Sequence, residues 1–449
     1  MRHALALVVA LACLQAVAAR PVGAADADLA ETLARCDSAA ASPFDKERPP
    51  GVAGVASHEI DPAVAIPACM AAVRAAPDVP RLWYQMARAD LAARRFDEFR
   101  DMAARADALG HAGGTHALGQ SHEAGHDGSP DLGAARTLYE RAAAAGFAPA
   151  MVDLGVMLED GAGGSADIAA ANAWYLKAAE VGEPVAMNLL ADNLVAGHGI
   201  ARDAGAGARW YRRAAEKGDS FAMASLGLLL ELGDGAPRNL KEANDWYRKS
   251  AAAGNRRGMR LLAINLETGN GLGKDSRAAI SWYKRAIEAG DVMSMRLISF
   301  SYFNGTGVPK DPQEGLYWLR KAAEAGDPAA MVTLGVRYAA GSGVPLDFDR
   351  GLDWLRRAAE RGDARADTAL AVLRDTGNGR PACQGVLGRY HEVGTTYDAL
   401  PARFSRNLPA FREVCAGLSG LREDDVRRCY LLNPGGAGDF VRKVRKQCR

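Results

Sequence analysis

The sequence predicts an all-α solenoid of helix-turn-helix repeats, and three periodic features carry that prediction. Tryptophan recurs every 36 residues with no insertion or deletion. Single glycines recur in the same phase from Gly146 to Gly362, and paired glycines recur from Gly161 and Gly163 onward. A period this regular is typical of stacked repeat proteins, in which each unit buries its apolar face against its neighbours. The tryptophans are Trp174, Trp210, Trp246, Trp282, Trp318 and Trp354.

The first helix of each repeat is marked by methionine and leucine. Met151, Leu154 and Leu158 lie at i, i+3 and i+7, which places them in one apolar stripe along a helix. A small residue in the middle of this helix, such as Gly155, leaves space for an aromatic side chain of a neighbouring helix. The paired glycines that follow are expected in a loop.

The second helix of each repeat carries the tryptophan. Ala171, Trp174 and Ala178 form its predicted apolar stripe. The single glycine that follows it, here Gly182, predicts a left-handed residue at the helix C-terminus, because glycine has no Cβ to oppose that conformation. Each repeat is therefore expected to read helix, glycine loop, helix, glycine turn.

These units resemble the Sel1-like repeat family, which is related to the tetratricopeptide repeats. The segments that carry the resemblance are Asp327-Pro-Ala-Ala-Met-Val-Thr-Leu-Gly335, Gly341-Ser-Gly-Val-Pro345 and Trp354-Leu-Arg-Arg-Ala-Ala-Glu-Arg-Gly362. It spans residues 111–379, about seven units and a closing half. The resemblance implies a right-handed solenoid in an exported bacterial protein. It also implies a non-enzymatic scaffold or regulatory adaptor with a protein or peptide partner and no cofactor, since family members commonly serve envelope signalling and assembly.

The beginning of the chain predicts export. Arg2 and His3 precede an apolar run, and Val22-Gly23-Ala24 offers a small-residue cleavage site, so residues 1–24 are expected to be a cleaved signal peptide. No other long apolar segment follows, and no transmembrane segment is predicted. The expected location is the periplasm or the exterior. A lipoprotein anchored at Cys13 is the less favoured alternative, because Ala10 stands where leucine is usual.

Three further regions flank the repeats. Residues 25–61 are expected to form an N-terminal cap segment, with an irregular connection between Pro43 and Gly54. Residues 62–110 predict tetratricopeptide-like helices, the first capped by Asp61 and running from Pro62 to Ala75. Residues 380–449 predict a basic, cysteine-containing helical cap.

Six cysteines outside the leader lie at the two ends of the chain, and the repeats contain none. This placement predicts disulfides that fasten the terminal repeats, which have only one neighbour each. Cys36 and Cys69 are the natural first pair, and the other four allow three connectivities. A zinc site is the competing interpretation, and the lack of any Cys-x-x-Cys disfavours it. The other four are Cys383, Cys415, Cys429 and Cys448.

The charge balance excludes a general affinity for nucleic acid. The formal charge is +1, and removal of Arg2 and Arg20 with the leader would make it −1. Basic residues gather only after Pro401, with eleven Arg and Lys against five Asp and Glu. A solvated face on a disulfide-held helix accounts for them most simply. The alternative is a contact with an anionic partner.

One motif points to catalysis. His122-Glu123-Ala124-Gly125-His126 matches the H-E-x-x-H pattern of zinc hydrolases, in which two imidazoles one helical turn apart bind the metal. The repeat phase argues against this alternative function. His122 falls at a core position, and Gly125 is the loop glycine, so the helix should end before His126. We therefore predict no catalytic residue and no metal, with His122 and His126 as weak candidates only.

The remaining candidate site is the surface of the first helices, which by analogy with tetratricopeptide arrays lines the concave side. Arg260 and Arg296 share one repeat phase, and Phe300 and Phe303 lie beside them. This mixture predicts binding of an extended peptide with an acidic or carboxylate group. The alternative is that the phenylalanines only cover the next helix. The expected binding residues are Asn188, Asp192, Arg260, Glu267, Arg296, Phe300, Phe303 and Asn304.

Overall fold

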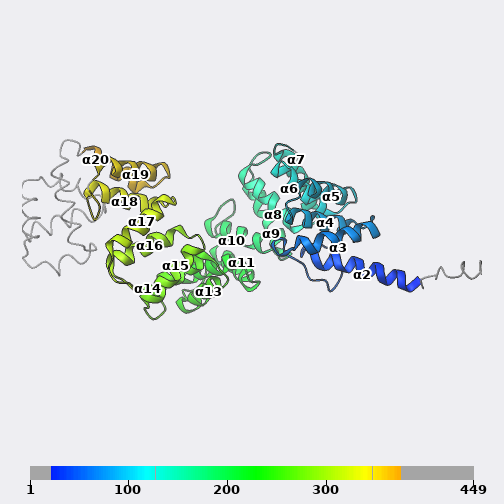
Figure 1. The fold of residues 1–449 in the computed structure, drawn as a ribbon, viewed down its shortest axis with the longest axis horizontal. Helices are drawn as coiled ribbons and strands as arrows, with labels where there is room; N and C mark the ends of the chain where they lie inside the picture. The colour runs from blue at the N-terminus through cyan, green and yellow to red at the C-terminus, as the bar shows by residue number, and fades with distance from the viewer. Residues whose placement is uncertain (1–21, 127, 346, 376–449) are drawn as a thin grey trace, which may run out of the picture. The chain divides into compact units, whose positions relative to one another are not determined.

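A computed structural model describes residues 22–126, 128–345 and 347–375 (Figure 1). Within these ranges the chain forms nineteen α-helices and one short 3-10 helix, and no strand. The all-α prediction is confirmed. The expected signal sequence up to residue 21, the basic C-terminal segment and the four C-terminal cysteines lie outside the described residues.

The helices follow the periodicity of the sequence. Those before the repeats are α2 (Val22–Ala40), η1 (Ser57–Glu59), α3 (Pro62–Ala75), α4 (Pro80–Ala92) and α5 (Phe96–Ala108). The first helices of the repeats are α6 (Ala112–Ala124), α8 (Ala148–Asp160), α10 (Pro184–Ala196), α12 (Ser220–Leu232), α14 (Arg256–Thr268), α16 (Val292–Asn304), α18 (Pro328–Ala340) and α20 (Ala364–Asp375). The second helices are α7 (Leu132–Ala144), α9 (Ile168–Glu180), α11 (Ala204–Glu216), α13 (Leu240–Ala252), α15 (Ser276–Glu288), α17 (Pro312–Glu324) and α19 (Phe348–Glu360).

The chain divides into two compact units. Among the described residues, unit 1 comprises those within 22–222 and 234–237, and unit 2 comprises those within 223–233 and 238–375. Inside each unit, helices pack mainly on their neighbours in the sequence, and the closest pairings join the two helices of one repeat, such as α10 with α11 and α14 with α15. This local packing is the arrangement expected of a repeat array.

Capping residues in constant phase set the helix ends. The second helix α9 begins after Asp167, whose carboxylate accepts a hydrogen bond from the Ala170 amide at 2.9 Å. The first helix α8 ends at Gly161, which has the left-handed φ of 72° that glycine adopts without penalty. The glycine two residues later has a second role. A Cβ on Gly163 would lie 2.2 Å from the Leu132 carbonyl oxygen of the preceding repeat, so only glycine allows this approach.

The buried aromatic residue of the repeat is tyrosine, and the tryptophan beside it lies nearer the surface. Tyr175 is fully buried and packs on Gly155, whereas Trp174 is half-buried. In five repeats a cation three residues after the tryptophan lies over the indole ring, at 3.9 to 4.9 Å from its centre. The predicted stripe of Ala171, Trp174 and Ala178 is therefore wrong at its aromatic position: the buried residues are Ala171, Tyr175 and Ala178.

A hydrogen bond between tyrosine and glutamate recurs through the array. Tyr175 donates to Glu159 at 2.9 Å, and Tyr247 donates to Glu231 at 2.7 Å, with the same separation of 16 residues in the sequence. Burial raises the pKa of both phenols, and the adjacent carboxylate raises it further, so each hydroxyl remains a donor. The same bond joins Tyr139 to Glu123 and Tyr283 to Glu267.

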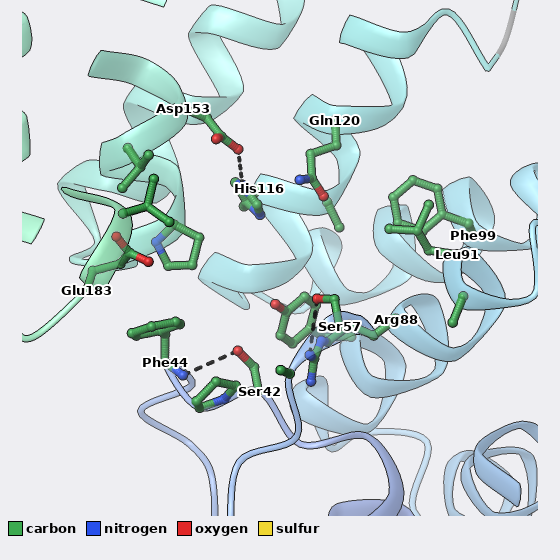
Figure 2. A pocket seen from close by; sticks show the side chains of 18 residues that line it. Ser42, Phe44, Ser57, Arg88, Leu91, Phe99, His116, Gln120, Asp153 and Glu183 are labelled. Carbon is green, nitrogen blue, oxygen red and sulfur yellow. Dashed lines mark hydrogen bonds and ion pairs between the residues drawn. The ribbon is translucent and has the colours of Figure 1, made fainter. Parts of the chain in front are cut away.

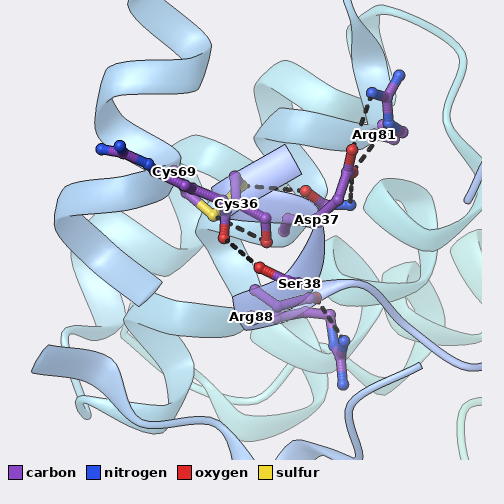
Figure 3. Close-up of a disulfide and its surroundings, with 9 residues drawn as sticks. Cys36, Asp37, Ser38, Cys69, Arg81 and Arg88 are labelled. Atoms are coloured by element: carbon purple, nitrogen blue, oxygen red, sulfur yellow. Dashed lines mark hydrogen bonds and ion pairs between the residues drawn. A yellow bond between two sulfur atoms is a disulfide. The ribbon is translucent and has the colours of Figure 1, made fainter. Parts of the chain in front are cut away.

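The predicted disulfide between Cys36 and Cys69 is present and links α2 to α3 (Figure 3). Both cysteines are fully buried in the apolar cluster of the first helices. Beside them Asp37 accepts hydrogen bonds from Arg81 at 3.1 and 3.2 Å. The first α-helix described is thus attached to the helices that precede the repeats.

The segment between α2 and α3 is irregular, as expected, and is held against the helices by buried polar contacts. Arg88 of α4 donates to the carbonyl oxygens of Ala40 at 2.6 Å and Val55 at 2.7 Å. His111 lies 3.2 Å from the Asp45 carboxylate. Burial acts to raise the pKa of Asp45, but the hydrogen bond and charge of His111, the Glu47 amide and the charge of Arg81 together hold it below its usual value. These contacts hold the segment between α2 and α3 against α4 and the start of α6.

Candidate functional site

In unit 2 the two arginines of the predicted surface form ion pairs within the protein. Arg260 of α14 contacts Asp291 at 2.5 Å, and Arg296 of α16 contacts Asp327 at 3.1 Å. Each aspartate caps the first helix of the following repeat. The arginine side chains are only 15% and 20% exposed. A ligand carboxylate would therefore have to share these guanidinium groups with the caps.

The other predicted residues of unit 2 differ in their availability. Glu267 accepts hydrogen bonds from Tyr283 at 2.9 Å and Ser301 at 3.1 Å. Phe303 lies beneath the Arg337 guanidinium, 4.0 Å from its ring centre. Phe300 is half-buried, and Asn304, the last residue of α16, is exposed. Asn304 is thus the most accessible predicted residue of α16.

Two predicted residues lie on α10 in unit 1. Asp192 is exposed and accepts a hydrogen bond from the Tyr211 hydroxyl. Asn188 is buried, and its side-chain oxygen has no hydrogen-bond partner. The eight residues thus include internally bonded, buried and accessible side chains.

The H-E-x-x-H segment does not form a zinc-binding helix. Helix α6 ends at Ala124, and Gly125 has a left-handed φ of 69°, so His126 leaves the helix axis. Its ring stacks on Phe96, with centroids 4.3 Å apart. Glu123 accepts the Tyr139 hydrogen bond at 2.6 Å. Within the described ranges, no group of three or more histidine, cysteine, aspartate or glutamate side chains could hold a metal ion.

Unit 1 contains a cavity of about 480 Å³ that the sequence did not reveal (Figure 2). Apolar and aromatic side chains form most of its walls, among them Phe44, Tyr84 and Phe99. Its polar residues include Arg88, His116, Gln120, Asp153 and Glu183. Mixed walls of this kind and a volume in this range are typical of ligand sites.

The acidic side of the cavity contains a buried carboxylate. Glu183 is 6% exposed and caps α10, accepting a hydrogen bond from the Ala186 amide at 2.5 Å. Burial raises the pKa of Glu183 to about 6, although the Ala186 and Val185 amides lower it. Asp153 lies on the same cavity and contacts the His116 imidazole at 2.7 Å.

The opposite charge on the cavity wall belongs to Arg88. Burial lowers the pKa of this guanidinium, while Tyr84 and Asp45 act to raise it. Its terminal nitrogens point to the Ala40 and Val55 carbonyls and to Ser57, as Figure 2 shows for Ser57. Arg88 therefore fastens the segment after α2.

Only one kind of sequence signal could have indicated this cavity. Val152 and Glu183 occupy the repeat positions that hold Arg260 with Asp291 and Arg296 with Asp327 in two repeats of unit 2, so that ion pair is missing here. No sequence pattern indicates that Ser42, Pro43 and Phe44 line the cavity, because their position depends on how the segment between α2 and α3 packs on the helices.

Comparison with known proteins identifies the repeats. The family model described as Sel1 repeat matches seven consecutive segments, at residues 114–147, 148–183, 184–219, 220–255, 257–291, 292–327 and 328–363. The chain belongs to the Sel1 repeat family. Sel1 repeats typically serve as non-catalytic scaffolds that mediate protein binding. The predicted resemblance is confirmed. A search of curated proteins found no match.

Solved structures with Sel1 repeats share this fold. A Sel1 repeat protein from Oxalobacter formigenes is 29% identical, with a TM-score of 0.50 over 54% of this chain and 96% of that one. A protective antigen of uropathogenic Escherichia coli strains that displays an SLR fold is 25% identical, with a TM-score of 0.59 over 95% of this chain and 86% of that one. Among the described residues of this Sel1 repeat protein, no helix is long and apolar enough to cross a membrane.

Proposed function

We propose that this Sel1 repeat protein is an exported scaffold or regulatory adaptor that binds a protein or peptide partner on the first helices of its repeats, in envelope signalling or assembly. The observation that carries the proposal is the array of seven Sel1 repeats, because that repeat family generally mediates protein binding. The buried disulfide between Cys36 and Cys69 supports an oxidising compartment, where such bonds persist. The periplasm and the exterior both meet that condition.

The partner surface can be tested by placing a photoreactive amino acid at Asn304 of α16. Tyr317 of α17, which is 48% exposed in the same repeat, provides the matched control on a second helix. We expect irradiation of living cells to crosslink one protein partner through position 304 and not through position 317. Equal crosslinking at both positions, or none at either, would contradict binding on the first helices.

The location is tested separately by sequencing the N-terminus of the mature protein. Cleavage of the expected leader would leave Ala25 as the first residue and place the protein in the periplasmic or culture fraction. A protein that keeps Met1, or whose cysteines are alkylated in intact cells as free thiols, would refute export.

A further inference from the structure

The repeat array provides an internal comparison for the buried carboxylate of unit 1. Three first helices, α10, α16 and α18, begin after a buried acidic residue that accepts the amide hydrogen bond of the third helical residue. The cap is Asp291 in α16 and Asp327 in α18. In each case an arginine 31 residues earlier, Arg260 or Arg296, forms an ion pair with the cap. The repeat thus has a place for a guanidinium beside its first-helix cap.

In unit 1 the acidic cap is present and the arginine is missing. Val152 precedes Glu183 by the same 31 residues and takes the position of the arginine. No ion pair joins Glu183 to a cation among the described residues, and the charges of Asp153 and Asp219 add to burial in raising its pKa. An uncompensated buried carboxylate is costly, and a bound cation would offset that cost.

With valine at position 152 in place of arginine, the space beside Glu183 forms part of the cavity. Val152 and Glu183 both line the cavity of unit 1, together with Val185 and Asp153. In Figure 2 the Glu183 carboxylate and the Phe44 ring lie on the same side of the cavity, across from Gln120 and Phe99. Arg88 does not fill the place, because its terminal nitrogens already bond the Ala40 and Val55 carbonyls.

We propose that this cavity binds an arginine side chain of the partner, with its guanidinium beside Glu183. Guanidinium matches a carboxylate with two parallel hydrogen bonds, and the three-carbon stem would pack on Val152 and Val185. The chain already pairs a guanidinium with a capping carboxylate at Asp291 and Asp327. The inference rests on the proposed scaffold function and specifies the chemistry of the partner.

The first test uses the full chain and the peptide acetyl-Ala-Ala-Arg-Ala-Ala-amide in calorimetric titrations. The same peptide with citrulline keeps the shape of arginine without its charge. We expect citrulline, or Glu183→Gln in the protein, to weaken binding at least about tenfold, because a hydrogen bond to a charged group is lost. Glu216→Gln, at an exposed glutamate of unit 1, should bind as the unchanged protein does. Equal binding of both peptides, or no binding of the arginine peptide at millimolar concentration, would overturn the proposal.

The second test supplies the arginine from the chain itself. Val152→Arg places a guanidinium where unit 2 has one, and Val152→Met adds comparable bulk without charge. We expect Val152→Arg to melt at a higher temperature than Val152→Met and to lose the arginine peptide. Adding Glu183→Gln should remove that difference in melting temperature. Equal melting temperatures for Val152→Arg and Val152→Met would refute a guanidinium site beside Glu183, whatever the result of crosslinking at Asn304. Failure of crosslinking alone would refute the scaffold surface and leave the cavity proposal standing.

Discussion

The tyrosine-glutamate bond of the repeat makes the sharpest prediction about stability. Tyr247 is fully buried, and its hydroxyl donates to Glu231 at 2.7 Å. The same carboxylate accepts from the amides of Asn265 at 3.3 Å and Asn270 at 2.7 Å. Tyr247→Phe removes one hydrogen bond to a charged group, so it should lower the free energy of unfolding by about 2 kcal/mol. Glu231→Leu should cost about 3 kcal/mol, because it leaves the buried Tyr247 hydroxyl without its acceptor and also removes one hydrogen bond from each of the two amides.

The chain indicates what happens when both partners change. In the repeat of α16 and α17 the equivalent positions hold Phe303 and Leu319, and Leu319 is fully buried without any hydrogen bond to satisfy. We therefore expect Tyr247→Phe combined with Glu231→Leu to cost about 2 kcal/mol less than the sum of the single changes.

The assay is urea unfolding followed by far-ultraviolet circular dichroism, with the four variants measured side by side. Tyr317→Phe, at a tyrosine that is 48% exposed, serves as the control and should change the unfolding free energy by less than about 0.5 kcal/mol. If the double variant equals the sum of the single variants to within about 0.5 kcal/mol, the bond contributes no coupling and the reasoning fails.

Three further predictions concern the helices before the repeats. Replacing Cys36 and Cys69 together by serine opens a loop spanning a sequence separation of 33 and should cost about 4 kcal/mol on a chain-entropy model; equal denaturation curves with and without reductant would contradict this. Burial raises the pKa of Asp90 to about 6, against the charge of Arg95, so its stabilising contribution is present below about pH 3.8 and is lost as pH rises through about 6. Asp90→Asn should therefore raise the unfolding free energy by up to about 3 kcal/mol at pH 8 and by almost nothing near pH 3.5, and a gain independent of pH would count against the burial argument. Arg94 has a left-handed φ of 60°, so Arg94→Gly should stabilise by about 1 kcal/mol in thermal unfolding, whereas a loss would show that the arginine side chain outweighs the backbone strain.

Helix boundaries were the most predictable feature, because capping depends on residues next to one another in the chain. The prediction from Pro62 to Ala75 matches α3, and Asp61 caps it as expected. The interruption of the zinc motif at Gly125 was predictable for the same reason, since a left-handed glycine ends the helix whatever surrounds it. The first disulfide also followed from the spacing of the only two cysteines between the leader and the repeats.

The candidate surface was harder to predict, because exposure and pairing depend on the neighbouring repeat. Arg260 and Arg296 share a phase in the sequence, but the caps that they contact belong to the next repeat. Periodicity also could not choose between Trp174 and Tyr175 for the buried position, since adjacent residues differ by only about 100° around a helix. The packing of Tyr175 on Gly155 made that choice.

The sequence alone determined the repeat, its family and the ends of its helices, because a strict period and local caps are properties of the chain itself. Only the tertiary structure decided which charges are paired and where the cavity lies. Folding brings Glu183, the cap of one repeat, against the first helix of the previous repeat, which carries Val152, so that both residues line the cavity. The segment around Phe44 closes the same cavity from far away in the sequence, and contacts at that separation depend on the complete fold of unit 1.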